Sequence, residues 1–158
     1  MTLNRRIWTN SRLLFFVCLY KAEPMEKFKL ENDITVMYLT ADSFPDGIMA
    51  AHHTLHAIVP SGDRLFFGVS YPDRTGNISY KAGAEQHSEQ ESLALGLDTY
   101  RIRQGIYNSI IIKDYFKDPS SISQAFQQLL ASPDLDPQGA CVEMYLGERD
   151  VRCMVRLK

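Results

Sequence analysis

The sequence predicts an α+β domain made of two copies of a β-α-β-β unit. Together the copies would form one curved antiparallel sheet with two helices on one face. Strand and helix signals follow the same order in two halves of the chain, about residues 26–86 and 98–158. Pro45 and Pro119, 74 positions apart, each stand at the start of a helical pattern. A length of 158 residues is typical of a single domain.

The first half begins with a β-branched apolar run over residues 34–41, which predicts a strand. The segment Ser43-Phe44-Pro45-Asp46 predicts a helix start, with a serine cap, an early proline and an acid in the first turn. Four residues then share one helical face: Ile48, His52, Leu55 and Val59. After a break at residues 60–63, two strands are expected at 65–71 and 77–84.

The second half repeats this order. A long strand is expected over residues 99–113, with a bulge or kink at Gly105. Asp118-Pro119 predicts a capped helix start. A hairpin of two strands, 141–146 and 151–157, completes the half.

The helices of the two halves match without a gap. Displacement by 74 residues places Pro45, Ile48, Ala51 and Leu55 on identical residues, namely Pro119, Ile122, Ala125 and Leu129. Neither half can cover its own apolar surface, so the two are expected to join. Both helices would then lie on one face of the sheet and leave the other face free to form a groove. Residues 86–98, rich in glutamate, are expected to be a solvated connector.

Residues 1–24 stand apart from this pattern. The apolar run over residues 13–20 is too short to cross a bilayer, which takes about 20 residues. A cleaved export signal is the alternative, but no small-residue cleavage site follows the run. We expect an appended or disordered segment before a domain that spans residues 25–158, and no membrane association.

Composition narrows the function classes. Seventeen basic and nineteen acidic residues leave a formal charge of −2, without the basic excess typical of direct nucleic-acid binding. Cys18, Cys141 and Cys153 are odd in number and lack Cys-x-x-Cys spacing, which argues against a disulfide framework or a zinc site and favours the cytoplasm. His52 and His56 lie one turn apart but have no evident third ligand, so His52 is expected to be a buried, hydrogen-bonded histidine. We expect neither a metal nor a cofactor.

Four segments in this order resemble the gyrase-inhibitor-like family, whose duplicated fold also occurs as the effector-binding domains of AraC- and MerR-type transcription regulators. The segments are residues 44–48, 105–107, 118–126 and 137–145. The resemblance covers about residues 26–158 and leaves no room for a DNA-binding domain. It therefore implies the stand-alone form of a small-molecule-binding domain.

The resemblance places a glutamate on a strand of the second half toward the ligand, and Val142-Glu143-Met144-Tyr145 matches that position. It also gives weight to Tyr107, in Gly105-Ile106-Tyr107. Strand alternation puts Glu143 and Tyr145 on one face, expected to be the groove, and Val142 and Met144 on the face under the helices. A glutamate among aromatic rings would have a raised pKa.

Aromatic residues on other predicted strands, Tyr71 and Tyr80, would supply further walls of a binding pocket. The expected ligand-binding set is thus Glu143, Tyr145, Tyr107, Tyr80 and Tyr71. A solvated strand glutamate and tyrosines that only pack in the core are the competing interpretations.

Three functions remain open. The leading one is sensing or sequestration of a hydrophobic or cationic small molecule. The second is hydrolysis of an electrophilic small molecule, with Glu143 and Tyr107 as catalytic residues. The third is a protein-binding role of the gyrase-inhibitor type, for which the sequence shows no patch beyond the acidic stretch from Glu85 to Glu91.

Overall fold

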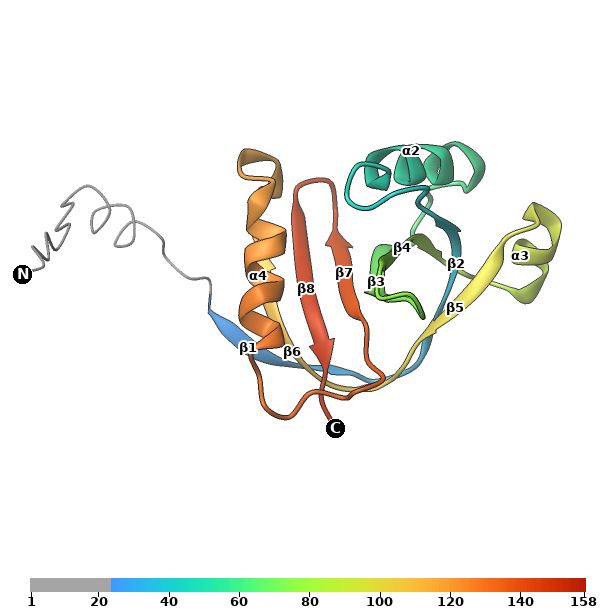
Figure 1. Cartoon of the computed structure of the whole chain (residues 1–158). Coiled ribbons are helices and arrows are strands. Elements are labelled where there is room, and N and C mark those ends of the chain that lie inside the picture. The colour runs from blue at the N-terminus through green and yellow to red at the C-terminus, as the bar shows by residue number, and fades with distance from the viewer. Residues whose placement is uncertain (1–23) are drawn as a thin grey trace, which may run out of the picture.

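Eight strands form one antiparallel sheet in the computed structural model, which describes residues 24–158 (Figure 1). The strands are β1 (Met25–Leu30), β2 (Ile34–Thr40), β3 (Phe66–Pro72), β4 (Ile78–Glu85), β5 (Asp98–Ile102), β6 (Gly105–Ile112), β7 (Cys141–Leu146) and β8 (Asp150–Arg156). The helices are α2 (Ile48–Ile58), α3 (Glu89–Leu95) and α4 (Ser120–Leu130), with the 3₁₀ turn η1 (Tyr115–Lys117) before α4. The expectation for the N-terminal segment falls on residues 1–23, outside the described residues.

The strand order confirms the predicted duplication. It runs β1-β6-β8-β7-β3-β4-β2-β5. The corresponding strands of the two halves are β1 and β5, β2 and β6, β3 and β7, and β4 and β8. When the members of each pair are exchanged, the strand order is reversed. The two halves therefore meet at the central pair, β3 and β7, which are antiparallel with Gly68 opposite Glu143.

Each half contains four strands, where the sequence pattern predicted three. The extra strands, β1 and β5, pair with β6 and β2 of the opposite halves. The expected long strand over 99–113 is divided between β5 and β6, because the chain turns before Gly105. Gly105 has a φ of 141°, and the guanidinium of Arg156 lies 3.0 Å from where a Cβ would stand. A residue with a side chain would therefore be both strained and crowded there.

Two boundaries differ from expectation. Helix α2 starts at Ile48, because residues 43–46 form a turn in which the N–H of Gly47 donates to the carbonyl of Ser43 at 3.1 Å. The expected connector contains α3, which is held by an ion pair of 2.8 Å between Glu91 and Arg64. Since the Arg64 side chain is only 6% exposed, this pair anchors α3 to the domain and is more than a solvated surface contact.

Helices α2 and α4 lie on the same face of the sheet, as predicted (Figure 1). Apolar side chains of α2 pack over β2 and β4, in a cluster of Met37, Ala51, Leu55, Val59, Tyr80, Ala82 and Ala84. Those of α4 pack over β6 and β8, in a cluster of Ile110, Ile112, Ala125, Leu129, Val151, Cys153 and Val155. The two helices thus cover the flanks of the sheet and not its central pair. Within residues 24–158, no helix is long and apolar enough to cross a membrane.

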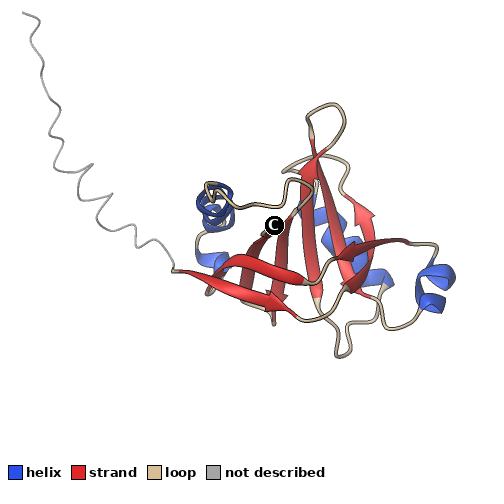
Figure 2. Cartoon of the chain, turned by 90° about the horizontal axis from the view of Figure 1, so that it is seen from below, coloured by secondary structure: helices blue, strands red, loops and turns tan. Residues whose placement is uncertain are grey.

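The opposite face was expected to be free, but it is filled. The sheet curls into a half-barrel, and β1 and β5 sweep across its lower end (Figures 1 and 2). This brings Leu30 and Ile102 into one buried cluster with the central residues Val69, Val142 and Met144. A sheet that curls in this way supplies part of its own cover, so apolar residues of this face form the main core.

Candidate functional site

Glu143 lies at the seam between the two halves. It is only 7% exposed and faces the side of the sheet that carries the helices. The predicted alternation is confirmed, but the two faces are the reverse of those expected: Cys141 and Tyr145 pack toward α4, while Val142 and Met144 belong to the core on the other side. Helices α2 and α4 stand apart over the flanks of the sheet. Glu143, on the central pair of strands, can therefore lie on the helix side without being covered by either helix.

Two phenols hold the carboxylate. Tyr80 of β4 and Tyr145 of β7 donate to the same oxygen, Oε2 of Glu143, at 3.1 and 2.5 Å. The Nε2 atom of His52, on α2, lies 2.9 Å from the Tyr80 hydroxyl. Because Tyr80 gives its one proton to Glu143, His52 must donate to Tyr80 through a protonated Nε2. A chain of hydrogen bonds thus runs from α2 to the buried carboxylate.

The Tyr80–Glu143 bond passes over β3, the strand between their own strands. Gly68 of β3 makes this possible because it has no side chain. A Cβ at Gly68 would stand 2.1 Å from the Tyr80 hydroxyl and 2.9 Å from Oε2 of Glu143. The glycine therefore creates the space in which phenol and carboxylate meet.

Aromatic rings surround this group. Phe44, from the turn before α2, stacks on Tyr80 with a centroid separation of 6.2 Å. His52 meets Tyr145 edge-on at 5.3 Å. Tyr115 of η1 approaches Tyr145 from the α4 side at 5.7 Å. The rings come from both halves, so the site depends on their association.

Burial sets the protonation of the site. It raises the pKa of Glu143, and the two phenol hydrogen bonds oppose that rise. Burial and the Glu143 charge raise the pKa of both Tyr145 and Tyr80, which remain donors at neutral pH. Burial, aided by the charge of His56, lowers the pKa of His52 from 6.5 to about 4, so His52 is neutral at pH 7. No lysine or arginine within residues 24–158 forms an ion pair with Glu143.

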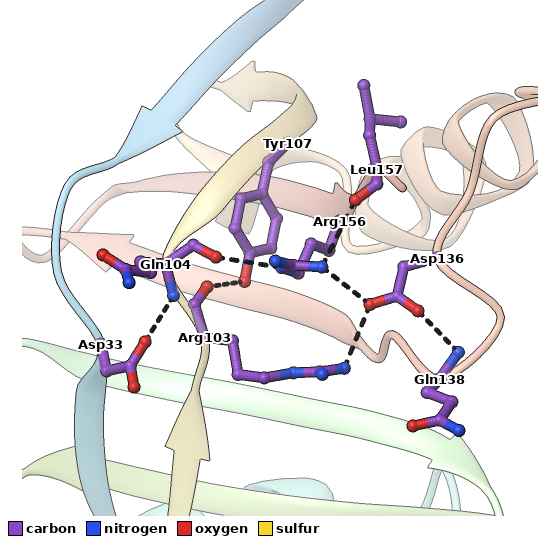
Figure 3. Close-up of polar contacts among 8 residues, drawn as sticks. All are labelled: Asp33, Arg103, Gln104, Tyr107, Asp136, Gln138, Arg156 and Leu157. Atoms are coloured by element: carbon purple, nitrogen blue, oxygen red, sulfur yellow. Dashed lines mark hydrogen bonds and ion pairs between the residues drawn. The ribbon is translucent and has the colours of Figure 1, made fainter.

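The structure groups only three of the five expected ligand-binding residues: Glu143, Tyr145 and Tyr80. Tyr107 lies in the core on the opposite face, 2% exposed, and its hydroxyl donates to the Arg103 carbonyl (Figure 3). Tyr71 also faces that side and stacks on Tyr100 at 6.2 Å. The expectation of one shared groove is wrong, because successive side chains of a strand point to opposite faces. Ile110 and Ile112 of β6 face α4, so Tyr107, an odd number of positions away, faces the other side.

Four residues of the site were not among the expected ligand-binding residues: Phe44, His52, Gly68 and Tyr115. His52 was expected to be hydrogen-bonded and buried, and its bond to Tyr80 agrees with that expectation. The nearby His56 stacks on Phe66 at 4.0 Å. Among residues 24–158, no group of three His, Cys, Asp or Glu side chains is arranged to hold a metal ion.

Comparisons with known proteins identify the fold. No family model matches the sequence, and no curated protein is detectably similar to it. An integron cassette protein from the mobile metagenome of Vibrio cholerae has a TM-score of 0.62 at 10% identity, over 85% of this chain and 95% of that chain. SAV2435, solved bound to tetraphenylphosphonium, has a TM-score of 0.63 at 10% identity, over 85% and 94%.

A hydrolase from Listeria innocua also matches, with a TM-score of 0.51 at 8% identity, over 92% of this chain and 97% of that chain. At such identities a likeness establishes shared architecture and nothing about ligands or activity. The chain is therefore similar in fold to these three proteins along nearly the whole length of each.

Proposed function

We propose that this chain is a small-molecule-binding domain of the gyrase-inhibitor-like type, which takes a hydrophobic cation against Glu143. The observation that carries the proposal is a buried carboxylate at the seam of the two halves, ringed by aromatic side chains. Within residues 24–158 no basic side chain neutralises it. A ligand of opposite charge would supply the missing partner.

The energetics favour a cation over a neutral molecule. An ionised carboxylate in an apolar setting is costly unless it is paired, and two phenols offset only part of that cost. A bound cation would restore the lost Coulomb interaction and would also be attracted to the faces of the surrounding rings. Phe44, Tyr80, Tyr115 and Tyr145 provide such rings.

The ligand must part the rings to reach the acid. Glu143 is 7% exposed. By contrast, Phe44, which stacks on Tyr80, is 47% exposed, and Phe116, which stacks on Tyr115, is 59% exposed. Exposed aromatic side chains move at little cost, so an apolar ligand would replace the contacts that Phe44 makes with Tyr80 and Phe116 makes with Tyr115. The same fold binds a lipophilic cation in SAV2435, which supports this assignment.

The direct test is calorimetric titration with tetraphenylphosphonium and, as a neutral probe of similar shape, triphenylphosphine oxide. Glu143→Gln keeps the size of the side chain and removes its charge. We expect it to weaken binding of the cation at least tenfold, or about 1.4 kcal/mol, and to leave binding of the neutral probe nearly unchanged. Glu148→Gln, in the exposed turn between β7 and β8, is the matched control. Equal affinity of wild type and Glu143→Gln for the cation would refute the proposal.

Hydrolysis of an electrophilic small molecule is the second candidate. It is favoured by the raised pKa of Glu143 and by the two phenols aimed at the same oxygen, because such a group could activate water while the phenols donate to the substrate. Incubation of the protein with epoxide and strained-ring electrophiles would test it. In that case Glu143→Gln would lose turnover but keep substrate binding, whereas a pure binding domain would show no turnover in either form.

A further inference from the structure

Lys81 lies on the face of β4 opposite to Tyr80. Although lysine side chains are almost never fully buried unless they are paired, Lys81 is only 7% exposed. Its Nζ atom sits over two rings, 4.1 Å from the centroid of Tyr38 and 5.4 Å from that of Tyr71. Consecutive residues of one strand thus direct a phenol to the acidic site on one face and an ammonium to the other.

The ammonium has no anionic partner in the described part of the chain. The side chain of Lys81 forms neither an ion pair nor a hydrogen bond with any other residue from 24 to 158. Its contacts with the two rings compensate for part of the lost hydration, but they accept none of its three N–H donors. Its Nζ atom is not among the fully buried polar atoms that lack a partner, so its donors remain accessible to a ligand.

The surroundings of Lys81 add both aromatic surface and positive charge. Tyr100 stacks on Tyr71 at 6.2 Å. Burial raises the pKa of Tyr100, an effect strengthened by Tyr71 and opposed by the charges of Arg103 and Lys81, which both act on its hydroxyl. We call Tyr38, Tyr71, Lys81 and Tyr100 the basic tyrosine cluster.

Arg103 adds charge beside this cluster, because it lines a small pocket together with Tyr100. It pairs with Asp136 at 3.1 Å, and Asp136 is also bound by Arg156 at 3.0 Å (Figure 3). One carboxylate therefore serves two guanidiniums, and the trio keeps a net positive charge. Arg103 is 47% exposed, so its remaining donors are accessible to a ligand.

We propose that the basic tyrosine cluster, with Arg103 at its edge, is a second binding site for a small aromatic anion such as a carboxylate or a phosphate monoester. The anion would accept from Lys81 and Arg103, and its ring would stack among the half-buried tyrosines. The two faces of the sheet would then bind ligands of opposite charge. This site does not depend on Glu143.

The test is titration with phenyl phosphate, followed by calorimetry and by amide shifts in NMR spectra, with inorganic phosphate as a second probe. We expect phenyl phosphate to bind more tightly than phosphate and to shift the amides of β4 and β5. Lys81→Met should weaken its binding at least tenfold. Lys113→Met removes an exposed lysine that pairs with Asp150, and should leave binding unchanged.

Arg103→Gln provides a second variant that does not disturb a buried position, and we expect it to weaken phenyl phosphate binding severalfold. Glu143→Gln should leave phenyl phosphate binding intact, which separates failure of this site from failure of the cation site. If Lys81→Met and Arg103→Gln both bind as wild type does, or if the shifts fall around Glu143, the second site is excluded. In that case Lys81 serves only to pack its hydrocarbon chain between tyrosines.

Discussion

The hydroxyl of Tyr80 lies 3.1 Å from Oε2 of Glu143, although the two residues are 63 positions apart and belong to different halves of the duplicated fold. Their strands, β4 and β7, do not pair with each other, because β3 lies between them. The contact exists because Gly68 on β3 leaves its position open. The acid and its first donor are thus joined only in the complete domain.

Gly68→Ala is expected to break this contact. Its Cβ would stand 2.1 Å from the Tyr80 hydroxyl, so the ring must move and Glu143 loses a donor. Crowding of this kind costs about 1–3 kcal/mol of unfolding free energy. Chemical denaturation of the variant measures that cost, and titration with tetraphenylphosphonium measures its effect on the site.

A double-mutant cycle identifies the cause. Tyr80→Leu removes the end of the ring, so adding Gly68→Ala to it should cost much less than in the wild-type background. Equal costs in both backgrounds would mean that the alanine acts through the strand backbone and not through Tyr80.

Glu143→Gln is expected to increase stability at neutral pH. The raised pKa means that the folded protein holds the Glu143 proton more tightly than the unfolded chain, whose value is near 4.5. The stability contributed by that proton is complete below 4.5 and is lost as the pH rises through the folded pKa. The advantage of the variant should therefore be small at about pH 4 and grow toward pH 8.

Thermal unfolding across this pH range checks the prediction, with Glu148→Gln as the control. The exposed residue should show no such growth with pH. A constant difference between Glu143→Gln and wild type at all pH values would show that the carboxyl titrates alike in the folded and unfolded states.

Tyr145→Phe removes the shorter of the two bonds to Glu143. A hydrogen bond to a charged group contributes about 1.5–3 kcal/mol, and the ionised form of Glu143 loses it. The pKa of Glu143 should rise further, as measured by the ¹³C shift of its carboxyl carbon. Tyr107→Phe is the matched control on the opposite face, where loss of a hydroxyl should leave the Glu143 pKa unchanged.

The duplication could be predicted from the sequence because it depends on local chemistry. Pro45 and Pro119 mark the two helix starts, and the apolar stripes that follow keep the same spacing. β1 and β5 were harder to recognise as separate elements. Each pairs only with the opposite half, so its partner is set by tertiary contacts and not by local sequence pattern.

The candidate site could be predicted only in part. Alternation placed Glu143 and Tyr145 together, and the structure confirms that they share a face. It could not show which face lies under the helices, since period-two patterns are symmetric when both sides are apolar. The role of Gly68 could not be foreseen either, because it depends on a ring that arrives from the neighbouring strand.

His52→Gln is expected to reduce the loss of stability in acid. The pKa of His52 falls from 6.5 to about 4 on folding, chiefly through burial. Between these values the unfolded chain binds a proton that the folded protein does not, so stability present above pH 6.5 is lost as the pH falls toward about 4. The loss is at most about 3 kcal/mol.

Glutamine can still donate to the Tyr80 hydroxyl, and it does not titrate. Unfolding free energies of the variant should therefore vary less with pH than those of wild type between about pH 4 and 6.5. His53→Gln, on the exposed side of α2, should behave as wild type does. If His52→Gln and wild type lose stability in parallel, then His52 is not held neutral by the fold.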